Sequence, residues 1–161
     1  MAKPRKSWRE KLADDKDLPK IVELEGKAAA KWGEGRMVIP APREVDALMK
    51  KIPRGKLITS KELREKLARK HKADMTCPIT TGIFAWIAAG AADEAARDGE
   101  ADEAITPFWR TLKAEGELNP KYPGGLEEQR ARLEAEGHKV VPRGRSKVRF
   151  VVDQFEQSLV S

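Results

Sequence analysis

Cysteine and histidine, the side chains that most often carry nucleophilic or metal-binding chemistry, are scarce in this chain of 161 residues. It contains one cysteine, Cys77, and two histidines, His71 and His138. A single cysteine excludes an internal disulfide and any multi-cysteine metal site, and two histidines this far apart do not predict a metal site. We therefore expect neither a metal nor a cofactor, and a reducing compartment such as the cytoplasm.

Long apolar runs are lacking as well. No run reaches the ~18 residues that a membrane-spanning helix requires. Residues 1–16 are basic, but they contain no apolar segment of the kind found in a secretory signal. We therefore expect no membrane contact and no secretory leader. The sequence also has no internal repeat and no low-complexity segment.

Charge, in contrast, is plentiful. Hydrophobic residues make up 40% of the chain and charged residues 36%, which suits one domain with a real core under a highly charged surface. The net charge is +6 and the isoelectric point is about 9.5. Such an excess of positive charge favours polyanionic partners, although a solvated basic surface without a partner would have the same composition. We expect a monomer.

The middle of the chain predicts a helix-turn-helix. Thr59 and Glu62 fit a capping box that opens a helix, and this helix should bury Leu63 and Leu67. A second helix is expected to begin near Cys77. Its apolar stripe is expected at Ile83, Phe84, Ile87 and Ala91. Helix pairs of this kind place their second helix against DNA in many proteins, but they are also common in plain helical domains.

Four short motifs follow one another along the chain. Residues 52–59 read Ile-Pro-Arg-Gly-Lys-Leu-Ile-Thr, Pro107 and Arg110 bracket two aromatic residues, residues 122–126 read Tyr-Pro-Gly-Gly-Leu, and residues 136–137 are Glu-Gly. In order and spacing these motifs resemble the C-terminal domain of the O6-alkylguanine-DNA alkyltransferase family. The resemblance implies a mainly helical α+β fold, with a winged-helix-like helix-turn-helix that binds DNA.

The resemblance covers residues 42–137 and suggests three regions. We predict an N-terminal extension over residues 1–35, anchored on the rest of the chain by Trp8 and Trp32. An alkyltransferase-like DNA-binding domain is expected over residues 36–138, and a C-terminal β-hairpin and tail over residues 139–161. Strand-like runs at 139–141 and 147–152 indicate the hairpin, and Gly137 is expected to end the helix before it.

The family's reactive motif is Pro-Cys-His-Arg, whose cysteine thiolate accepts the alkyl group. Here Phe108 stands at the cysteine position and Trp109 at the histidine position. A phenyl ring cannot accept an alkyl group, so the resemblance implies a protein that is not an enzyme. The alkyltransferase-like group of the family also lacks the cysteine, and its members bind alkylated guanine and flag it for repair. Phe108 and Trp109 would either stack on an extruded base or plug the base pocket.

The resemblance also implies which residues contact DNA. Ser60 stands where the family has a tyrosine. Trp86 or Ile87 stands where the family has an intercalating arginine, although both of these apolar residues could instead belong to the core. Arg110 could instead form a structural ion pair, and Glu136 is expected to be a capping or surface group. The predicted DNA-binding residues are Thr59, Ser60, Lys61, Thr80, Thr81, Trp86 and Arg110. The predicted base-pocket residues are Pro107, Phe108, Trp109, Tyr122, Gly124 and Gly125.

Three functions are compatible with the sequence. The first is non-enzymatic binding of double-stranded DNA, in which alkylated or altered bases such as alkylated guanine are recognised for a repair-protein partner. The second is a scaffold repurposed as a protein-interaction or small-ligand module. The third is chemistry at Cys77, whose place at the start of a helix suits a reactive thiol, against the alternative of a buried and inert one.

Two basic clusters could follow a phosphate backbone or be solvated surface. The first lies near the N-terminus and contains Lys3, Arg5, Lys6, Arg9 and Lys11. The second lies in the predicted hairpin and contains Arg143, Arg145, Lys147 and Arg149.

Overall fold

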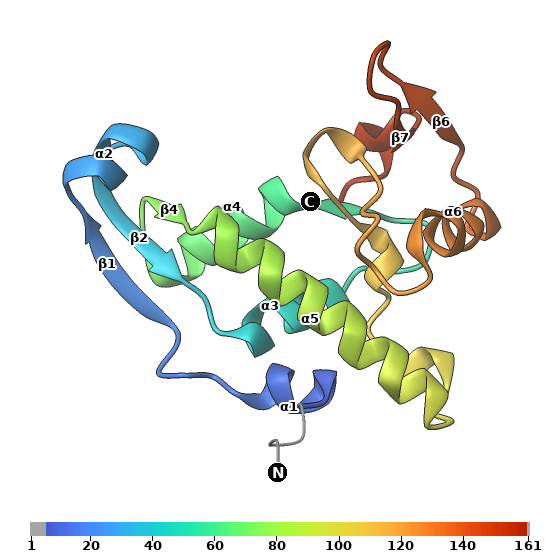
Figure 1. Ribbon diagram of the computed structural model, residues 1–161, viewed down its shortest axis with the longest axis horizontal. Helices are drawn as coiled ribbons and strands as arrows, with labels where there is room; N and C mark the ends of the chain where they lie inside the picture. Colours follow the sequence, from blue (N-terminus) through green and yellow to red (C-terminus); the bar gives the residue numbers. More distant parts are fainter. Residues whose placement is uncertain (1–5, 161) are drawn as a thin grey trace.

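The computed structural model describes residues 6–160, which form a mainly helical α+β structure with three small sheets (Figure 1). The helices are α1 Trp8–Ala13, α2 Gly26–Trp32, α3 Pro42–Lys50, α4 Ser60–His71, α5 Pro78–Arg97 and α6 Gly125–Ala135. The strands are β1 Lys20–Leu24, β2 Gly35–Ile39, β3 Ile58–Thr59, β4 Met75–Thr76, β5 Thr111–Leu112, β6 Val140–Arg143 and β7 Arg149–Val152. Short 3-10 turns are η1 Asp102–Ala104, η2 Phe108–Arg110, η3 Ala114–Gly116 and η4 Phe155–Ser158. The predicted fold class is confirmed.

The long helix α5 crosses the middle of the molecule, and α1, α3 and α4 pack against it (Figure 1). Its buried face consists of small side chains: Thr81, Ala85, Ala88, Ala89, Gly90, Ala91, Ala92 and Ala95. Small side chains allow neighbouring helices to approach closely. At Gly90, an added Cβ would lie 2.3 Å from a ring carbon of Trp8, so only glycine leaves room for α1.

The predicted apolar stripe of α5 is wrong for most of its positions. Ile83 is exposed, Phe84 and Ile87 are only partly buried, and of the four predicted residues Ala91 alone is fully buried. The physical reason is that α3 and the main core pack on the alanine face of the helix. Ile83 therefore lies at the surface, and Phe84 lies at the edge of the core.

The predicted helix-turn-helix is present as α4, β4 and α5. The Thr59 amide donates a 3.0 Å hydrogen bond to the Glu62 carboxylate, as the capping box predicted, and Leu63 and Leu67 are buried. The turn between the helices passes through Lys72 in the left-handed region, with φ of 55°. The beginning of α4 and its buried face thus follow from local patterns that are visible in the sequence.

The N-terminal segment is attached to the rest of the chain in two places. Strand β1 pairs antiparallel with β2, which pairs in parallel with β4, so that residues 20–24 and the helix-turn-helix share one sheet. Trp8 packs edge-on against Trp86 of α5 with ring centroids 4.9 Å apart. Trp32 packs with Leu24, Met37 and Cys77 in a small second core. The predicted anchoring roles of both tryptophans are confirmed.

A second small sheet, formed by β3 and β5, lies beside the C-terminal part of the chain. These strands pair in parallel, with Ile58 opposite Thr111. The predicted hairpin is confirmed as β6 and β7, which pair antiparallel from Val140 opposite Val152 to Arg143 opposite Arg149. The last described residues run beside β3. There the Leu57 amide donates to the Ser158 carbonyl at 2.9 Å, and the Val160 amide donates to the Leu57 carbonyl at 3.0 Å.

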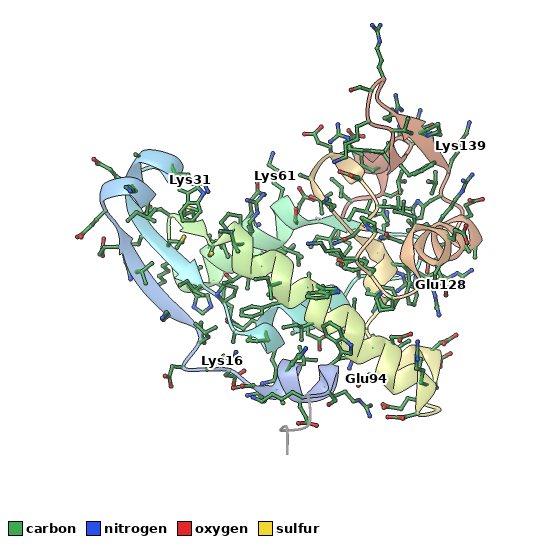
Figure 2. The ribbon with its side chains drawn as sticks, viewed as in Figure 1. Lys16, Lys31, Lys61, Glu94, Glu128 and Lys139 are labelled. Carbon is green, nitrogen blue, oxygen red and sulfur yellow. The ribbon has the colours of Figure 1, made fainter. Side chains whose placement is uncertain are left out.

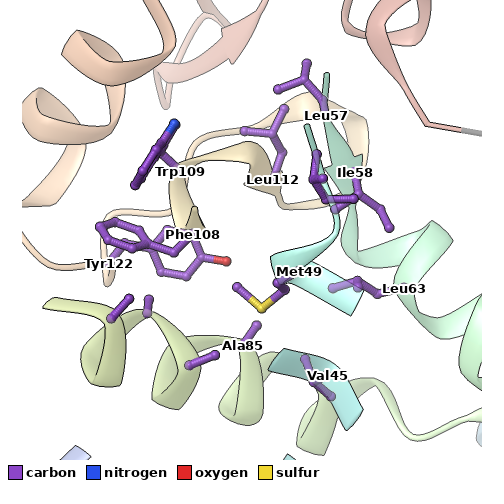
Figure 3. Packing of buried hydrophobic residues seen from close by; sticks show 14 of the residues in the cluster. Val45, Met49, Leu57, Ile58, Leu63, Ala85, Phe108, Trp109, Leu112 and Tyr122 are labelled. Carbon is purple, nitrogen blue, oxygen red and sulfur yellow. The ribbon is translucent and has the colours of Figure 1, made fainter. Parts of the chain in front are cut away.

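The main hydrophobic core lies between α5 and the segments that carry β3, β5 and η2 (Figure 3). Labelled members of this core are Val45, Met49, Leu57, Ile58, Leu63, Ala85, Phe108, Trp109, Leu112 and Tyr122. Two of them, Phe108 and Trp109, are the aromatic pair that Pro107 and Arg110 bracket. None of the helices in residues 6–160 is long and apolar enough to cross a bilayer.

Candidate nucleic-acid interface

A groove of about 560 Å³ runs between α5, the beginning of α4 and the segment 111–122. We call it the α5 groove. Its volume is within the range of about 300–1,000 Å³ found for small-ligand pockets. Ser60 and Arg64 line it from α4, and Thr111 and Tyr122 line it from the opposite segment. The groove is therefore formed by the helix-turn-helix and by the loop that follows the aromatic pair Phe108–Trp109.

One wall of the α5 groove is apolar and exposed. Ile79, Ile83 and Trp86 lie on one face of α5, and their exposed fractions are 56%, 44% and 38%. A single exposed isoleucine is ordinary on a protein surface, but three large apolar side chains together indicate a surface that contacts something. The edge-on contact of Trp8 holds Trp86 at the end of this row.

The charged residues of the α5 groove are all positive. Arg64, Lys113 and Lys121 line it, and no aspartate or glutamate does. None of these three cations has an ion pair within residues 6–160, and Arg64 donates only to the backbone carbonyl of Ser60, at 3.3 Å. The groove thus combines an apolar wall with unpaired positive charge, an arrangement that suits an anionic ligand with flat apolar parts.

Thr111 and Tyr122, which line the α5 groove, carry buried hydroxyl groups. The Thr111 hydroxyl is buried and has no hydrogen-bond partner in the described part of the chain. Burial raises the pKa of the Tyr122 hydroxyl, partly offset by a hydrogen bond with Asn119, so Tyr122 stays protonated at neutral pH. Both hydroxyls are neutral groups that can donate or accept hydrogen bonds.

The predicted DNA-binding residues are divided by the structure. Ser60 and Trp86 line the α5 groove, as does Thr81, but Thr81 is buried and donates its hydroxyl to the Cys77 carbonyl at 2.7 Å. Thr80 makes a longer bond of 3.4 Å to the same carbonyl. Two predicted residues lie outside the groove: Thr59, the last residue of β3, is buried in the capping box, and Lys61, at the beginning of α4, is exposed beside a separate hollow (Figure 2).

Arg110 belongs to a buried ion pair. Its guanidinium binds both oxygens of the Glu136 carboxylate, the shortest contact being 2.8 Å, and donates to the Ile52 carbonyl at 2.8 Å. The Glu136 carboxylate also accepts from the Trp109 indole at 2.7 Å and from the Gly55 amide at 3.0 Å. We call these five residues the Glu136 cluster. Every nitrogen of the Arg110 guanidinium has a partner within the fold, so the structural ion pair is confirmed and the predicted DNA contact of Arg110 has no support.

The predicted capping position of Glu136 is confirmed, because Glu136 is the C-cap residue of α6, but the alternative of a surface group is wrong. Its side chain is only 4% exposed and that of Arg110 is 14% exposed. Burial raises the pKa of Glu136, but the hydrogen bonds from Arg110, Trp109 and the Gly55 amide outweigh it, so the net pKa is lowered. The carboxylate is therefore charged in the folded protein at neutral pH, in spite of its burial.

The predicted base-pocket residues do not meet in one cavity. Tyr122 lines the α5 groove, but Pro107 and Trp109 line a separate hollow of about 450 Å³ on the side of Glu136. Gly124 and Gly125 line a further hollow near Phe150. Because these hollows open apart from one another, the predicted set does not describe a single pocket.

Phe108 and Trp109 plug the interior and are not free to stack on a base. Phe108 is 3% exposed and packs edge-on against Trp109 and Tyr122, with ring centroids 5.4 and 5.6 Å away (Figure 3). One face of Trp109 is covered by the guanidinium of Arg132, 4.3 Å from the ring centroid. The two rings have protein neighbours on the surfaces that a base would need.

The predicted site did not include several residues that give the α5 groove its character, among them Arg64, Ile79, Ile83, Thr111, Lys113 and Lys121. Ile79, Ile83 and Trp86 follow a spacing of four and three residues, which places them on one helix face. That row could have been found as a second apolar stripe opposite the alanines. The two lysines come from an irregular loop, and no pattern in the sequence joins them to α5.

Cys77 and the described residues of the N-terminal basic cluster are accounted for by packing and charge pairing. Cys77 is buried in the second core, which matches the alternative of an inert thiol. In the N-terminal basic cluster, Lys6 pairs with Asp14 at 2.7 Å, and Arg9 pairs with Asp98 and Glu100. Lys3 and Arg5 of the same cluster lie outside the described residues.

Compared with known proteins, the chain matches no family model and no curated protein. Among solved structures, it is similar to S. pombe Atl1 in complex with damaged DNA containing O6-carboxymethylguanine. The identity is 18%, the TM-score is 0.48, and the similarity covers 74% of this chain and 94% of that one. This is a distant likeness of fold.

Proposed function

We propose that the protein is a non-enzymatic DNA-binding protein that holds double-stranded DNA in the α5 groove and recognises an alkylated or otherwise altered base there. The main support for the proposal is the lining of the groove. It contains the exposed apolar row of Ile79, Ile83 and Trp86, and all of its charged residues are positive. Phosphates would meet Arg64 and Lys113, and bases would meet the apolar row.

Trp86 is the residue that suits contact with a base. It is the one aromatic ring on the exposed row of α5, and Trp8 supports it from behind. Apolar side chains inserted between base steps kink a duplex, and stacking on an aromatic ring contributes ~1–3 kcal/mol per base. An alkyl group that weakens base pairing lowers the cost of extruding the base, which would favour the altered site.

The absence of a nucleophile supports binding without transfer. Phe108 stands at the position of the resembled family's cysteine and is part of the core. The one thiol of the chain, Cys77, is buried against Leu24 and Met37 and does not line the α5 groove. Recognition would therefore leave the base unchanged, and a repair protein would have to act afterwards.

A second candidate function rests on the same apolar row. Ile79 and Ile83 would also suit the apolar face of a partner helix, as in helix-in-groove recognition. The positive lining distinguishes the two candidates, because DNA binding through it must weaken with salt. Apolar association with a protein would be nearly insensitive to salt.

The test is binding of the full chain to a short duplex with and without one O6-methylguanine, at two salt concentrations, followed by fluorescence anisotropy. We expect salt-sensitive binding that is tighter for the altered duplex. Trp86→Ala should lower the affinity for the altered duplex by about fivefold or more. Lys113→Gln with Lys121→Gln should lower the affinity for both duplexes alike.

The matched control is Lys20→Gln with Lys27→Gln, which removes the same charge from exposed positions of β1 and α2. This variant should bind both duplexes as the unaltered protein does. An unaltered protein that fails to bind either duplex at low salt would contradict the proposal and favour a protein partner. Equal affinity for the two duplexes would reduce the function to general DNA binding.

A further inference from the structure

The β6–β7 hairpin carries a second concentration of unpaired positive charge. Its exposed segment contains Arg143, Arg145, Lys147 and Arg149. Arg143 pairs with Asp153 at 3.1 Å, and Arg149 lies 3.8 Å from Glu117. Within residues 6–160, Arg145 and Lys147 have no acidic partner. The two cations at the hairpin tip, between the strands, are therefore available to a ligand.

The hairpin is fixed to the wall of the α5 groove. The Leu118 amide donates to the Phe150 carbonyl at 2.9 Å, and Glu117 forms an antiparallel bridge with Val151. Leu118 is buried, and it belongs to the same segment, 111–122, that carries Lys113 and Lys121 of the groove. Figure 1 shows the hairpin beside this segment. Strand β7 is therefore joined to the segment 111–122, other residues of which form one wall of the groove.

The tip has a defined shape. Gly144 adopts a φ of +100°, and a Cβ at this position would lie 2.5 Å from the Lys147 carbonyl oxygen. Only glycine allows the chain to turn this tightly, so the turn brings the backbone of Gly144 against that of Lys147. Such a turn holds Arg145 and Lys147 on one short protrusion of the fold.

The described residues of the N-terminal basic cluster do not offer a comparable surface. Lys6 and Arg9 are neutralised by the ion pairs described above, and Lys11 lies over the ring of Trp8, 4.5 Å from its centroid. Within residues 6–160, the unpaired cations of the hairpin are therefore the stronger candidate for a second anion-binding surface.

We propose that the tip of the β6–β7 hairpin is a second phosphate-binding surface, through which Arg145 and Lys147 contact the backbone of the same duplex that occupies the α5 groove. The inference rests on the proposed function and adds a second, separate contact to it. Phosphate contacts position a protein on DNA without reading its sequence. Contacts at two separate places, the α5 groove and the hairpin tip, would therefore fix the orientation of the duplex on the protein.

The test measures how the affinity for a duplex of about 20 base pairs changes with salt. Each phosphate contact contributes about 0.9 to the slope of log affinity against log salt. We therefore expect Arg145→Gln with Lys147→Gln to lower the slope by about 1.8, while the preference for O6-methylguanine is unchanged. The charge-preserving pair Arg145→Lys with Lys147→Arg should keep the slope of the unaltered protein, and so should Lys20→Gln with Lys27→Gln.

Failure of the inference and failure of the proposed function give different results. If the tip variant keeps the full slope while Lys113→Gln with Lys121→Gln lowers it, the hairpin does not touch DNA and the groove does. If the unaltered protein binds no duplex at low salt, both proposals fall. Loss of binding to vesicles of phosphatidylcholine and phosphatidylserine, with an unchanged DNA slope, would assign the tip to a membrane surface and overturn the inference.

Discussion

The indole of Trp109 donates a 2.7 Å hydrogen bond to the carboxylate of Glu136, and this carboxylate also binds Arg110 and the Gly55 amide. One buried carboxylate therefore joins three segments that are far apart in the sequence: the turn after α3, the turn η2 and the end of α6. The indole of Trp109 can only donate a hydrogen bond, because its ring has no basic nitrogen, and here it holds the Glu136 carboxylate in place.

Glu136→Gln should destabilise the protein strongly. The substitution leaves the Arg110 guanidinium buried without its counter-charge, and breaking a buried pair in this way costs about 3–5 kcal/mol. Urea unfolding followed by circular dichroism measures the effect. The control is Glu134→Gln, which removes an exposed helix pair with Arg130 and should cost no more than about 0.5 kcal/mol. A Glu136→Gln variant as stable as this control would show that the cluster contributes little.

Stability should fall in acid because of Glu44 and Glu136. Burial raises the pKa of the Glu44 carboxyl, but hydrogen bonds from Lys70, the Ala41 amide and His71 outweigh it, and the net pKa is lowered, as it is for Glu136. A lowered folded-state pKa means that the unfolded state binds more protons. The stability from both groups is thus present above their ordinary pKa of 4.5 and is lost as the pH falls below it.

His138 adds an earlier, smaller loss. Burial lowers the pKa of His138 from 6.5, while Glu136 opposes the shift, and the Nε2 atom has no partner in the described residues. The neutral form is therefore favoured in the folded state, and its contribution is lost as the pH falls below about 6.5. Melting temperatures measured from about pH 8 to pH 3 should decline in two steps. His138→Gln should remove the upper step and Glu44→Gln should weaken the lower one.

Gly90→Ala should separate α1 from α5. The added methyl group would lie 2.3 Å from a ring carbon of Trp8, so the helices must move apart or strain, at a cost of about 1–3 kcal/mol. Gly82→Ala is the matched control on the same helix, since nothing lies within 4 Å of its Cβ. It should stabilise α5 by about 0.5–1 kcal/mol. Thermal unfolding compares the two variants, and equal stability would contradict the packing of Trp8 on Gly90.

Phe108→Cys should not restore alkyl transfer. The side chain is almost fully buried, and Trp109 cannot activate a thiol as a histidine would. Mass spectrometry after incubation with a duplex that contains O6-methylguanine should find no methylated protein. Phe108→Ala should cost about 3–5 kcal/mol in stability, as expected for a truncated core aromatic residue. A methylated Phe108→Cys protein would instead show that this position is open to DNA.

Local signals in the sequence predicted the elements that depend on neighbouring residues. The capping box of Thr59 and Glu62, the helix end at Gly137 and the strands of the hairpin were all predicted, because each is decided within a few residues. The buried face of α5 was predicted wrongly. Alanine and isoleucine rows lie on opposite faces of this helix, and the row that is buried depends on helices elsewhere in the chain.

The candidate site was less predictable than the fold. Ser60 and Trp86 were predicted and line the α5 groove, but Lys113 and Lys121 reach it from a loop without a periodic pattern. The burial of Glu136 depends on three segments meeting at one carboxylate, and no local spacing indicates such a meeting. Contacts between distant segments therefore account for most of what the sequence did not predict.

The strand-like contact between Leu57 and residues 158–160 bears on how the chain folds as it is synthesised. Because a ribosome releases the N-terminal residues first, the Leu57 amide emerges long before the Ser158 carbonyl that it will bind. During that interval one edge of β3 has no partner, and an open strand edge invites pairing with another chain. The nascent protein is therefore open to aggregation, and to binding by chaperones, until residues 158–160 pair with Leu57.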